Sequence, residues 1–184
     1  MRKFTYLGSI ITSDGRAASD IKRRIGMAKD TFQKMESVLK NRQLSLETKR
    51  KVLECYVTPV LVYGCESWTI SGEMERRIEA AEMWFYRRML RISWIDRVTN
   101  EEVLRRIGAK RSLLHKIRKR QLEFLGHAMR KEGLEEQILT GMIEGKRSRG
   151  RQRLKYIECL GKWMNVESTD LLRTTKDVLK GHAT

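Results

Sequence analysis

Basic side chains gather in two stretches of the sequence that contain no acidic residue. The stretches comprise Arg105, Arg106, Lys110, Arg111, Lys116, Arg118, Lys119 and Arg120, and then Lys146, Arg147, Arg149, Arg151, Arg153 and Lys155. A phosphate backbone relieves the mutual repulsion of such charges and releases condensed counterions as it binds. Arginine is the commoner cation in both stretches, and its planar guanidinium can bind phosphate through two hydrogen bonds. The stretches therefore predict contact with nucleic acid; a solvated face that keeps the protein soluble is the alternative.

The residue types that perform catalysis or bind metals form no recognisable constellation in this sequence. The chain has three histidines and three cysteines. Cys55, Cys65 and Cys159 lack the close pairwise spacing of zinc ligands, and their separation favours small apolar side chains in a core. No phosphate-binding loop, nucleophile elbow or zinc-protease motif occurs, and no two aspartates are adjacent. We therefore expect no independent enzymatic activity, no cofactor and no bound metal ion.

The composition is that of a basic globular protein. The 184 residues carry a net charge of +16, and 40% of them are hydrophobic, which is enough for a core. No apolar run approaches the roughly 20 residues of a membrane span, and no secretory signal is recognisable. Separated cysteines in odd number indicate a reducing compartment. We expect an intracellular protein without membrane contact, and the composition of residues 146–155 is typical of a nuclear-import signal.

The elements that must position these charges begin with a strand. Residues 4–12 are rich in β-branched and aromatic side chains, and Ser13, Asp14 and Gly15 end this segment with turn chemistry. A lone strand cannot satisfy its own backbone groups, so we expect it to pair. No later segment offers a partner, and this indicates that the chain is a piece of a longer protein.

Helical periodicity follows from residue 17 to residue 92. Apolar residues predict one helix over 17–39, a second over 45–61 that Pro59 kinks or divides, and a third over 71–92. These three amphipathic helices have the size of a three-helix bundle. Lys22, Arg23, Arg24 and Lys29 lie near the start of the first helix. Trp84 adjoins the apolar face of the third helix, which favours a place in the core over stacking on a base.

The C-terminal half is also predicted to be helical. Thr99 and Glu102 form a capping box that opens a helix ending at Gly108. Further helices are expected over 112–131, 153–164 and 169–180. The fold class is therefore mainly α, with a helical bundle, a basic helical C-terminal region and a short N-terminal strand.

Several segments, taken in order, resemble one family. They are FTYLGSIITSDG, RRIGMAKDTFQKM, YVTPVLVYGCESWTI, EMWFYRRMLRISWIDRVTNEEVLRRIG, QLEFLGHAMR and IEGKRSRGRQR. Together they are similar to the C-terminal part of the reverse transcriptase of non-LTR retrotransposons (LINE-type, RTE- or jockey-like), over roughly residues 3–160. The resemblance implies a palm remnant over 1–15, a thumb-like helical bundle over 16–94 and a basic post-thumb region over 95–184. It also implies that Tyr6 and Gly8 lie in the hairpin that grips the primer strand.

The resemblance extends to binding but not to catalysis. Polymerases of this family hold two magnesium ions on an aromatic-x-Asp-Asp motif. That motif precedes the primer-grip strand and is missing from this chain. The resemblance thus implies a non-catalytic fragment of an RNA-directed DNA polymerase. Because no base-reading motif is present, we expect it to recognise shape and charge.

Our hypothesis is that the chain binds RNA, DNA or their hybrid through backbone phosphates. Lys22, Arg23, Arg24 and Lys29 would face the template–primer duplex, and the two basic stretches would add electrostatic attraction. Three alternatives stay open. The chain could be a transposon-derived helical module that binds a protein such as a palm-containing polypeptide, a decayed fragment without a selected role, or an enzyme in its own right.

Overall fold

The computed structural model describes residues 3–12, 17–130, 133–140 and 155–173. At the N-terminus, β1 (Lys3–Tyr6) pairs antiparallel with β2 (Ser9–Thr12), so that Tyr6 lies opposite Ser9. The prediction of a single strand over 4–12 was therefore wrong. Leu7 and Gly8 form the turn with φ values of 46° and 77°, which suits the twist of a two-residue hairpin. The hairpin supplies the backbone partners that one extended strand would lack.

The first expected helix is α1 (Ala18–Lys34), followed by the short α2 (Glu36–Leu39). The second is divided into α3 (Leu46–Val52), a π-helical turn η1 (Leu53–Val57) and α4 (Thr58–Val62). Proline lacks an N–H group and clashes with the carbonyl four residues earlier, so a widened turn before Pro59 accommodates it. The expected interruption at this proline is confirmed.

The central helix and its neighbours begin and end at residues with recognisable capping chemistry. After the 3-10 turn η2 (Cys65–Ser67), Ser71 caps α5 (Gly72–Leu90) by accepting a hydrogen bond from the Met74 N–H. A second 3-10 turn, η3 (Trp94–Asp96), leads to α6 (Asn100–Ile107). The hydroxyl of Thr99 accepts from the Glu102 N–H at 3.3 Å, and Gly108 ends the helix in the left-handed region. The predicted cap and stop are confirmed.

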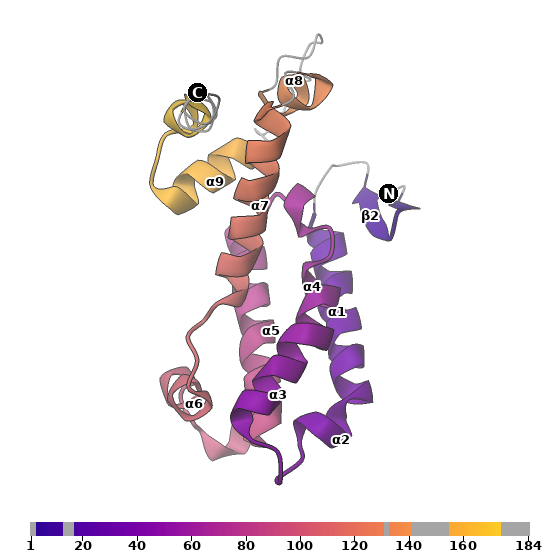
Figure 1. Cartoon of the computed structure of the whole chain (residues 1–184), viewed down its shortest axis with the longest axis vertical. Helices are drawn as coiled ribbons and strands as arrows, with labels where there is room; N and C mark the ends of the chain where they lie inside the picture. The colour runs from indigo at the N-terminus through magenta and orange to yellow at the C-terminus, as the bar shows by residue number, and fades with distance from the viewer. Residues whose placement is uncertain (1–2, 13–16, 131–132, 141–154, 174–184) are drawn as a thin grey trace, which may run out of the picture.

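The C-terminal part begins with α7 (Leu113–Arg130), which leads away from the bundle toward α8 (Leu134–Thr140) and α9 (Tyr156–Met164) (Figure 1). Residues 168–173 are also helical. The sequence did not predict α8. The rest of the helix expected over 169–180 lies outside the described residues.

Within the described residues, two hydrophobic cores follow this arrangement. The larger extends from α1 to the first half of α7 and includes Ile21, Phe32 and Ile78. The smaller joins the second half of α7 to α9 and the helical residues 168–173. Since Val103 and Ile107 of α6 belong to the larger core, packing is continuous across residue 94. The division into units at that residue stays a prediction.

The expected mainly α fold with a short N-terminal β element is confirmed. None of the helices in the described ranges combines the length and apolar character that a membrane crossing requires.

Candidate nucleic-acid interface

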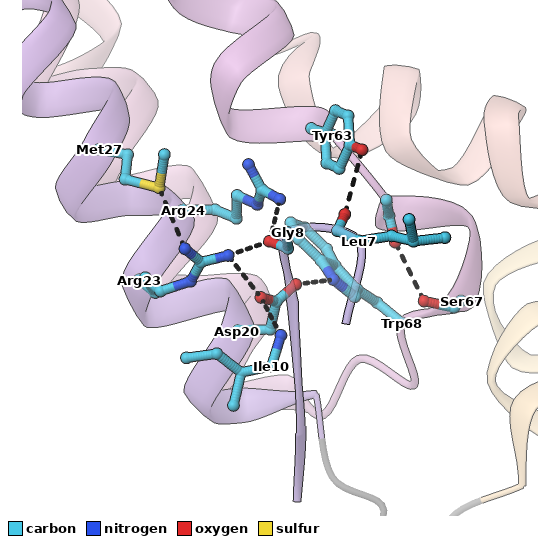
Figure 2. Close-up of polar contacts among 11 residues, drawn as sticks. Leu7, Gly8, Ile10, Asp20, Arg23, Arg24, Met27, Tyr63, Ser67 and Trp68 are labelled. Carbon is cyan, nitrogen blue, oxygen red and sulfur yellow. Dashed lines mark hydrogen bonds and ion pairs between the residues drawn. The ribbon is translucent and has the colours of Figure 1, made fainter. Parts of the chain in front are cut away.

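The hairpin is anchored to α1 by a buried carboxylate. Asp20 is 2% exposed. Its Oδ1 accepts from the Ile10 N–H at 2.9 Å, and its Oδ2 accepts from the Trp68 indole N–H at 3.0 Å (Figure 2). Arg23 lies 3.6 Å from the same carboxylate. One side chain of α1 thereby joins β2 to the segment after α4.

The tip of the hairpin is held by its backbone carbonyls. The guanidinium groups of Arg23 and Arg24 both donate to the carbonyl oxygen of Gly8. The Tyr63 hydroxyl donates to the carbonyl oxygen of Leu7 at 3.1 Å (Figure 2), and Arg24 lies 4.3 Å from the centroid of the Tyr63 ring. Arg24 is only 5% exposed. These contacts fix the turn and direct both arginines toward protein partners.

One face of the hairpin is apolar and open to solvent. Phe4 and Tyr6 are 63% and 57% exposed, and their rings stack with centroids 6.3 Å apart. Ile11, which lies opposite Phe4 in the register, is 53% exposed. At the tip, Leu7 is also exposed in the left-handed region, a conformation that side chains with a Cβ adopt at a cost. The predicted site residue Tyr6 therefore belongs to an aromatic and aliphatic surface.

The remaining predicted cations of α1 share one face of the helix. Lys22 is exposed and Lys29 is half-buried. Residues seven apart lie almost above one another on a helix. The ammonium group of Lys29 lies 5.1 Å from the centroid of the Trp84 ring. The predicted group of four cations is thus split, with Arg23 and Arg24 turned to the hairpin and Lys22 and Lys29 on another face.

Lys29 borders a groove that the sequence did not reveal. We call it the Trp84 groove. It has a volume of about 690 Å³ and is lined by Lys40, Trp84, Arg87, Arg88, Arg91, Ile92 and Ser93. Arg88 lies 5.1 Å from the Trp84 centroid. Trp84 is half-buried and not fully in the core. A helical spacing of basic residues around one tryptophan in α5 was the available signal.

The basic stretch between residues 105 and 120 is largely paired with carboxylates. Glu102 accepts from Arg105 at 2.7 Å and from Arg106 at 2.6 Å. Hydrogen bonds from these two arginines lower the pKa of Glu102 to about 2. Further pairs join Arg111 to Glu79, Lys116 to Glu54, Lys119 to Glu123 and Arg120 to Glu66. Most of these carboxylates come from other elements. They offset much of the positive charge of the stretch, although the stretch itself contains no acidic residue.

Arg118, a predicted site residue, is 2% exposed inside the protein. Its guanidinium donates to Glu75 at 2.5 Å and to the Gln121 side-chain oxygen at 3.1 Å. The Gln121 amide in turn donates to the carbonyl oxygens of Cys65 and Trp68. Arg118 therefore orders the contact between α7 and the segment after α4. The predicted residues Lys146, Arg147, Arg149, Arg151 and Arg153 lie outside the described residues.

The cysteines show no arrangement for ligation. Cys55 is exposed, whereas Cys65 and Cys159 are buried. Burial is the main cause that raises the pKa of the Cys65 thiol to about 12. In the part of the chain that the structure describes, no group of three or more histidine, cysteine or acidic side chains is placed to hold a metal ion.

Comparison with known proteins gives one informative similarity. The chain is 27% identical over 177 residues to an uncharacterized transposon-derived protein of Caenorhabditis elegans. The match covers 91% of this chain and 62% of that relative, so the chain spans less than two thirds of the relative's length. No protein-family model matches the chain, and no solved structure matches it. The similarity supports a transposon-derived origin.

Proposed function

We propose that the chain is the thumb-containing C-terminal portion of a non-LTR retrotransposon reverse transcriptase and binds nucleic acid through backbone phosphates without catalysing polymerisation. The similarity to a transposon-derived protein and the order of the resembling segments support this origin. The observation that carries the proposal is the hairpin clamped to α1 by Asp20, Arg23 and Arg24. It places an exposed aromatic surface beside a cationic helix in a chain of net charge +16.

The charges near the hairpin suit a phosphate backbone. Arg23 and Arg24 donate to a neutral carbonyl oxygen, which orients both groups, although the charge of Arg23 is partly offset by Asp20 at 3.6 Å. Lys22 and Lys29 are separated along α1 by about 10 Å, which corresponds to about three base-pair steps along the axis of a duplex. We propose that these two lysines contact phosphates of one strand.

A salt titration tests the binding. Labelled RNA, DNA and hybrid duplexes are titrated with the full chain, and the affinity is measured across salt concentrations. Contact with about six phosphates predicts a log–log slope near −4 to −5. The variant Lys22→Gln is expected to weaken binding and to reduce the slope by about one.

The matched control is Lys51→Gln. Lys51 is 72% exposed on α3 and is paired with Glu47 at 2.9 Å, so its removal should leave the slope unchanged. Absence of binding at low salt, or a flat salt response, contradicts the proposal. A primer-extension product in the presence of magnesium and deoxynucleotides would contradict its non-catalytic part.

A second candidate function is protein binding, for which the exposed apolar face of the hairpin is the specific observation. Phe4, Tyr6 and Ile11 are each more than half exposed, and such surfaces mark interaction sites. A palm-containing polypeptide of the same element is the partner to test. Under this alternative, Phe4→Ser with Ile11→Ser abolishes an association that survives nuclease digestion and leaves nucleic-acid affinity unchanged. Loss of the association on digestion contradicts it.

A further inference from the structure

The Trp84 groove lies where the C-terminal half of α5 passes the ends of α1 and α2. Four of its lining residues are cationic and none is a carboxylate. Ring contacts place Lys29 of α1 at the same tryptophan. The groove therefore collects positive charge from α1, from the end of α2 and from α5, which lies far from the other two in the sequence.

Two of the lining arginines are held by uncharged oxygen atoms. The Arg91 Nε donates to the Lys40 carbonyl oxygen at 3.1 Å. Arg87 donates to the Val98 carbonyl oxygen at 2.7 Å and to the Asn100 side-chain oxygen at 3.0 Å. Because a guanidinium has five donors, these bonds leave others available. Both groups are oriented by the fold and keep their full charge.

The indole of Trp84 orders two further cations. Its ring meets Phe32 at 5.4 Å between centroids, which fixes it against the larger core. Lys29 and Arg88 both lie 5.1 Å from its centroid. An aromatic face attracts such cations but does not neutralise them.

Among the described residues that form ion pairs with the groove lining, one is a carboxylate, Glu36. It forms an ion pair with Lys40 and lies 4.0 Å from Arg88. The hydrogen bond from Lys40 and the charges of Lys40 and Arg88 lower the pKa of Glu36. One negative charge stands against the five cations of Lys29 and the lining residues, so the groove keeps a positive excess.

We infer that the Trp84 groove binds the phosphodiester backbone of a nucleic-acid strand, with Arg88 and Lys29 as its phosphate contacts. This inference rests on the proposed function and deepens it, because it assigns residues that the basic stretches of the sequence do not contain. Preoriented guanidinium groups bind phosphate with little loss of side-chain entropy. Lys29 belongs both to the face of α1 that carries Lys22 and to the edge of the groove. A bound strand can therefore contact that face of α1 and the groove together.

The test is the double variant Lys29→Gln with Arg88→Gln in the full chain. Both side chains lie against the Trp84 ring, and Arg88 is 48% exposed, so we expect the thermal unfolding midpoint to change little. With labelled single-stranded RNA, we expect roughly a tenfold or greater loss of affinity. The log–log salt slope should become shallower by about 1.4. The variant Arg88→Lys, which keeps the charge, should restore most of the affinity relative to Arg88→Gln.

The control variant is Arg76→Gln, an exposed arginine near the start of α5 and about 18 Å along the helix from Arg88, which should bind as the unmodified chain does. If the unmodified chain binds RNA and the double variant behaves like Arg76→Gln, the groove assignment is wrong although the proposed function stands. If the double variant loses affinity for polyglutamate and keeps its affinity for RNA, the groove serves an acidic protein and the inference is again wrong. If the folded unmodified chain binds no nucleic acid, the proposed function fails and the groove assignment falls with it.

Discussion

Two cationic regions of this molecule differ in the partners of their charges. Around α1 and the end of α5, backbone carbonyls and aromatic rings are frequent partners of the cations, as Gly8 and Tyr63 are for Arg24. The ion pairs there join Asp20 to Arg23, and Glu36 to Lys40 and Arg88. Around α6 and α7, the cations contact carboxylates, as Arg105 does with Glu102. A carbonyl orients a guanidinium and leaves its charge, whereas a carboxylate cancels most of it. We therefore expect the first region to be the more electropositive, although the second has the denser run of basic residues.

The origin of the carboxylates explains the difference. Four of the carboxylates precede their partner cations by dozens of residues and come from η1, η2 and α5, namely Glu54, Glu66, Glu75 and Glu79. The helical packing brings them next to a stretch that contains no acidic residue itself. A run of basic residues in a sequence thus predicts a positive electrostatic potential only where the fold brings no carboxylates from other elements.

The largest expected effect separates structural from binding arginines. We predict that Arg118→Met lowers the free energy of unfolding by about 2 kcal/mol, because the buried Gln121 oxygen loses its donor and the partly exposed Glu75 loses its ion pair. Urea unfolding measures this effect. The neighbouring Arg120, which is 47% exposed and 3.7 Å from Glu66, is the matched control. For Arg120→Met we expect a change of no more than about 0.5 kcal/mol. Equal stability of the two variants would show that Arg118 has no structural role.

The second prediction concerns Asp20, which anchors the hairpin to α1 in the first region. Asp20→Ala should cost about 2 kcal/mol, since the Ile10 N–H and the Trp68 indole N–H lose their acceptor. We also expect limited proteolysis to cleave the hairpin faster. Asp30→Ala, at an exposed position on the same helix, should change neither measurement. An unaltered cleavage rate in Asp20→Ala would mean that Asp20 does not anchor the hairpin.

Local features of the fold could be predicted because short-range chemistry determines them. The Thr99 cap, the Gly108 stop and the interruption at Pro59 follow from backbone groups within a few residues. The Leu7–Gly8 turn was missed because β-branched residues on both sides hide it, and because leucine is uncommon in the left-handed region. The helix α8 was missed because it is short.

The candidate site was less predictable, since it depends on tertiary neighbours. Composition identified the positive charge, but only the packing of α7 shows that Arg118 is buried. Likewise, Lys29 and Arg88 are distant in the sequence and meet at one indole ring. Residue spacing within a single helix cannot predict a contact between side chains of two different helices.

The third prediction would weaken the contrast between the regions. Glu102→Gln removes the carboxylate that offsets one of the two positive charges of Arg105 and Arg106, so we expect up to about a threefold gain in RNA affinity. Because the pKa of Glu102 is lowered to about 2, its stabilising contribution is present above the unfolded value of about 4.3 and is lost as pH falls toward 2. The affinity ratio between variant and unmodified chain should therefore be the same at about pH 7 and about pH 5. A ratio that changes between these pH values would contradict the assigned ionisation.

The smallest expected effect belongs to the residues that the sequence favoured most. Arg105→Gln with Arg106→Gln should lower RNA affinity by only about twofold, because Glu102 already offsets one of the two positive charges. The same removal of two charges at Lys29 and Arg88 should have a several-fold larger effect. Parallel titrations under identical salt conditions compare the two double variants directly. If the Arg105 and Arg106 variant loses more affinity, nucleic acid displaces the carboxylate from its arginines, and the pairing in the free protein does not determine which region binds.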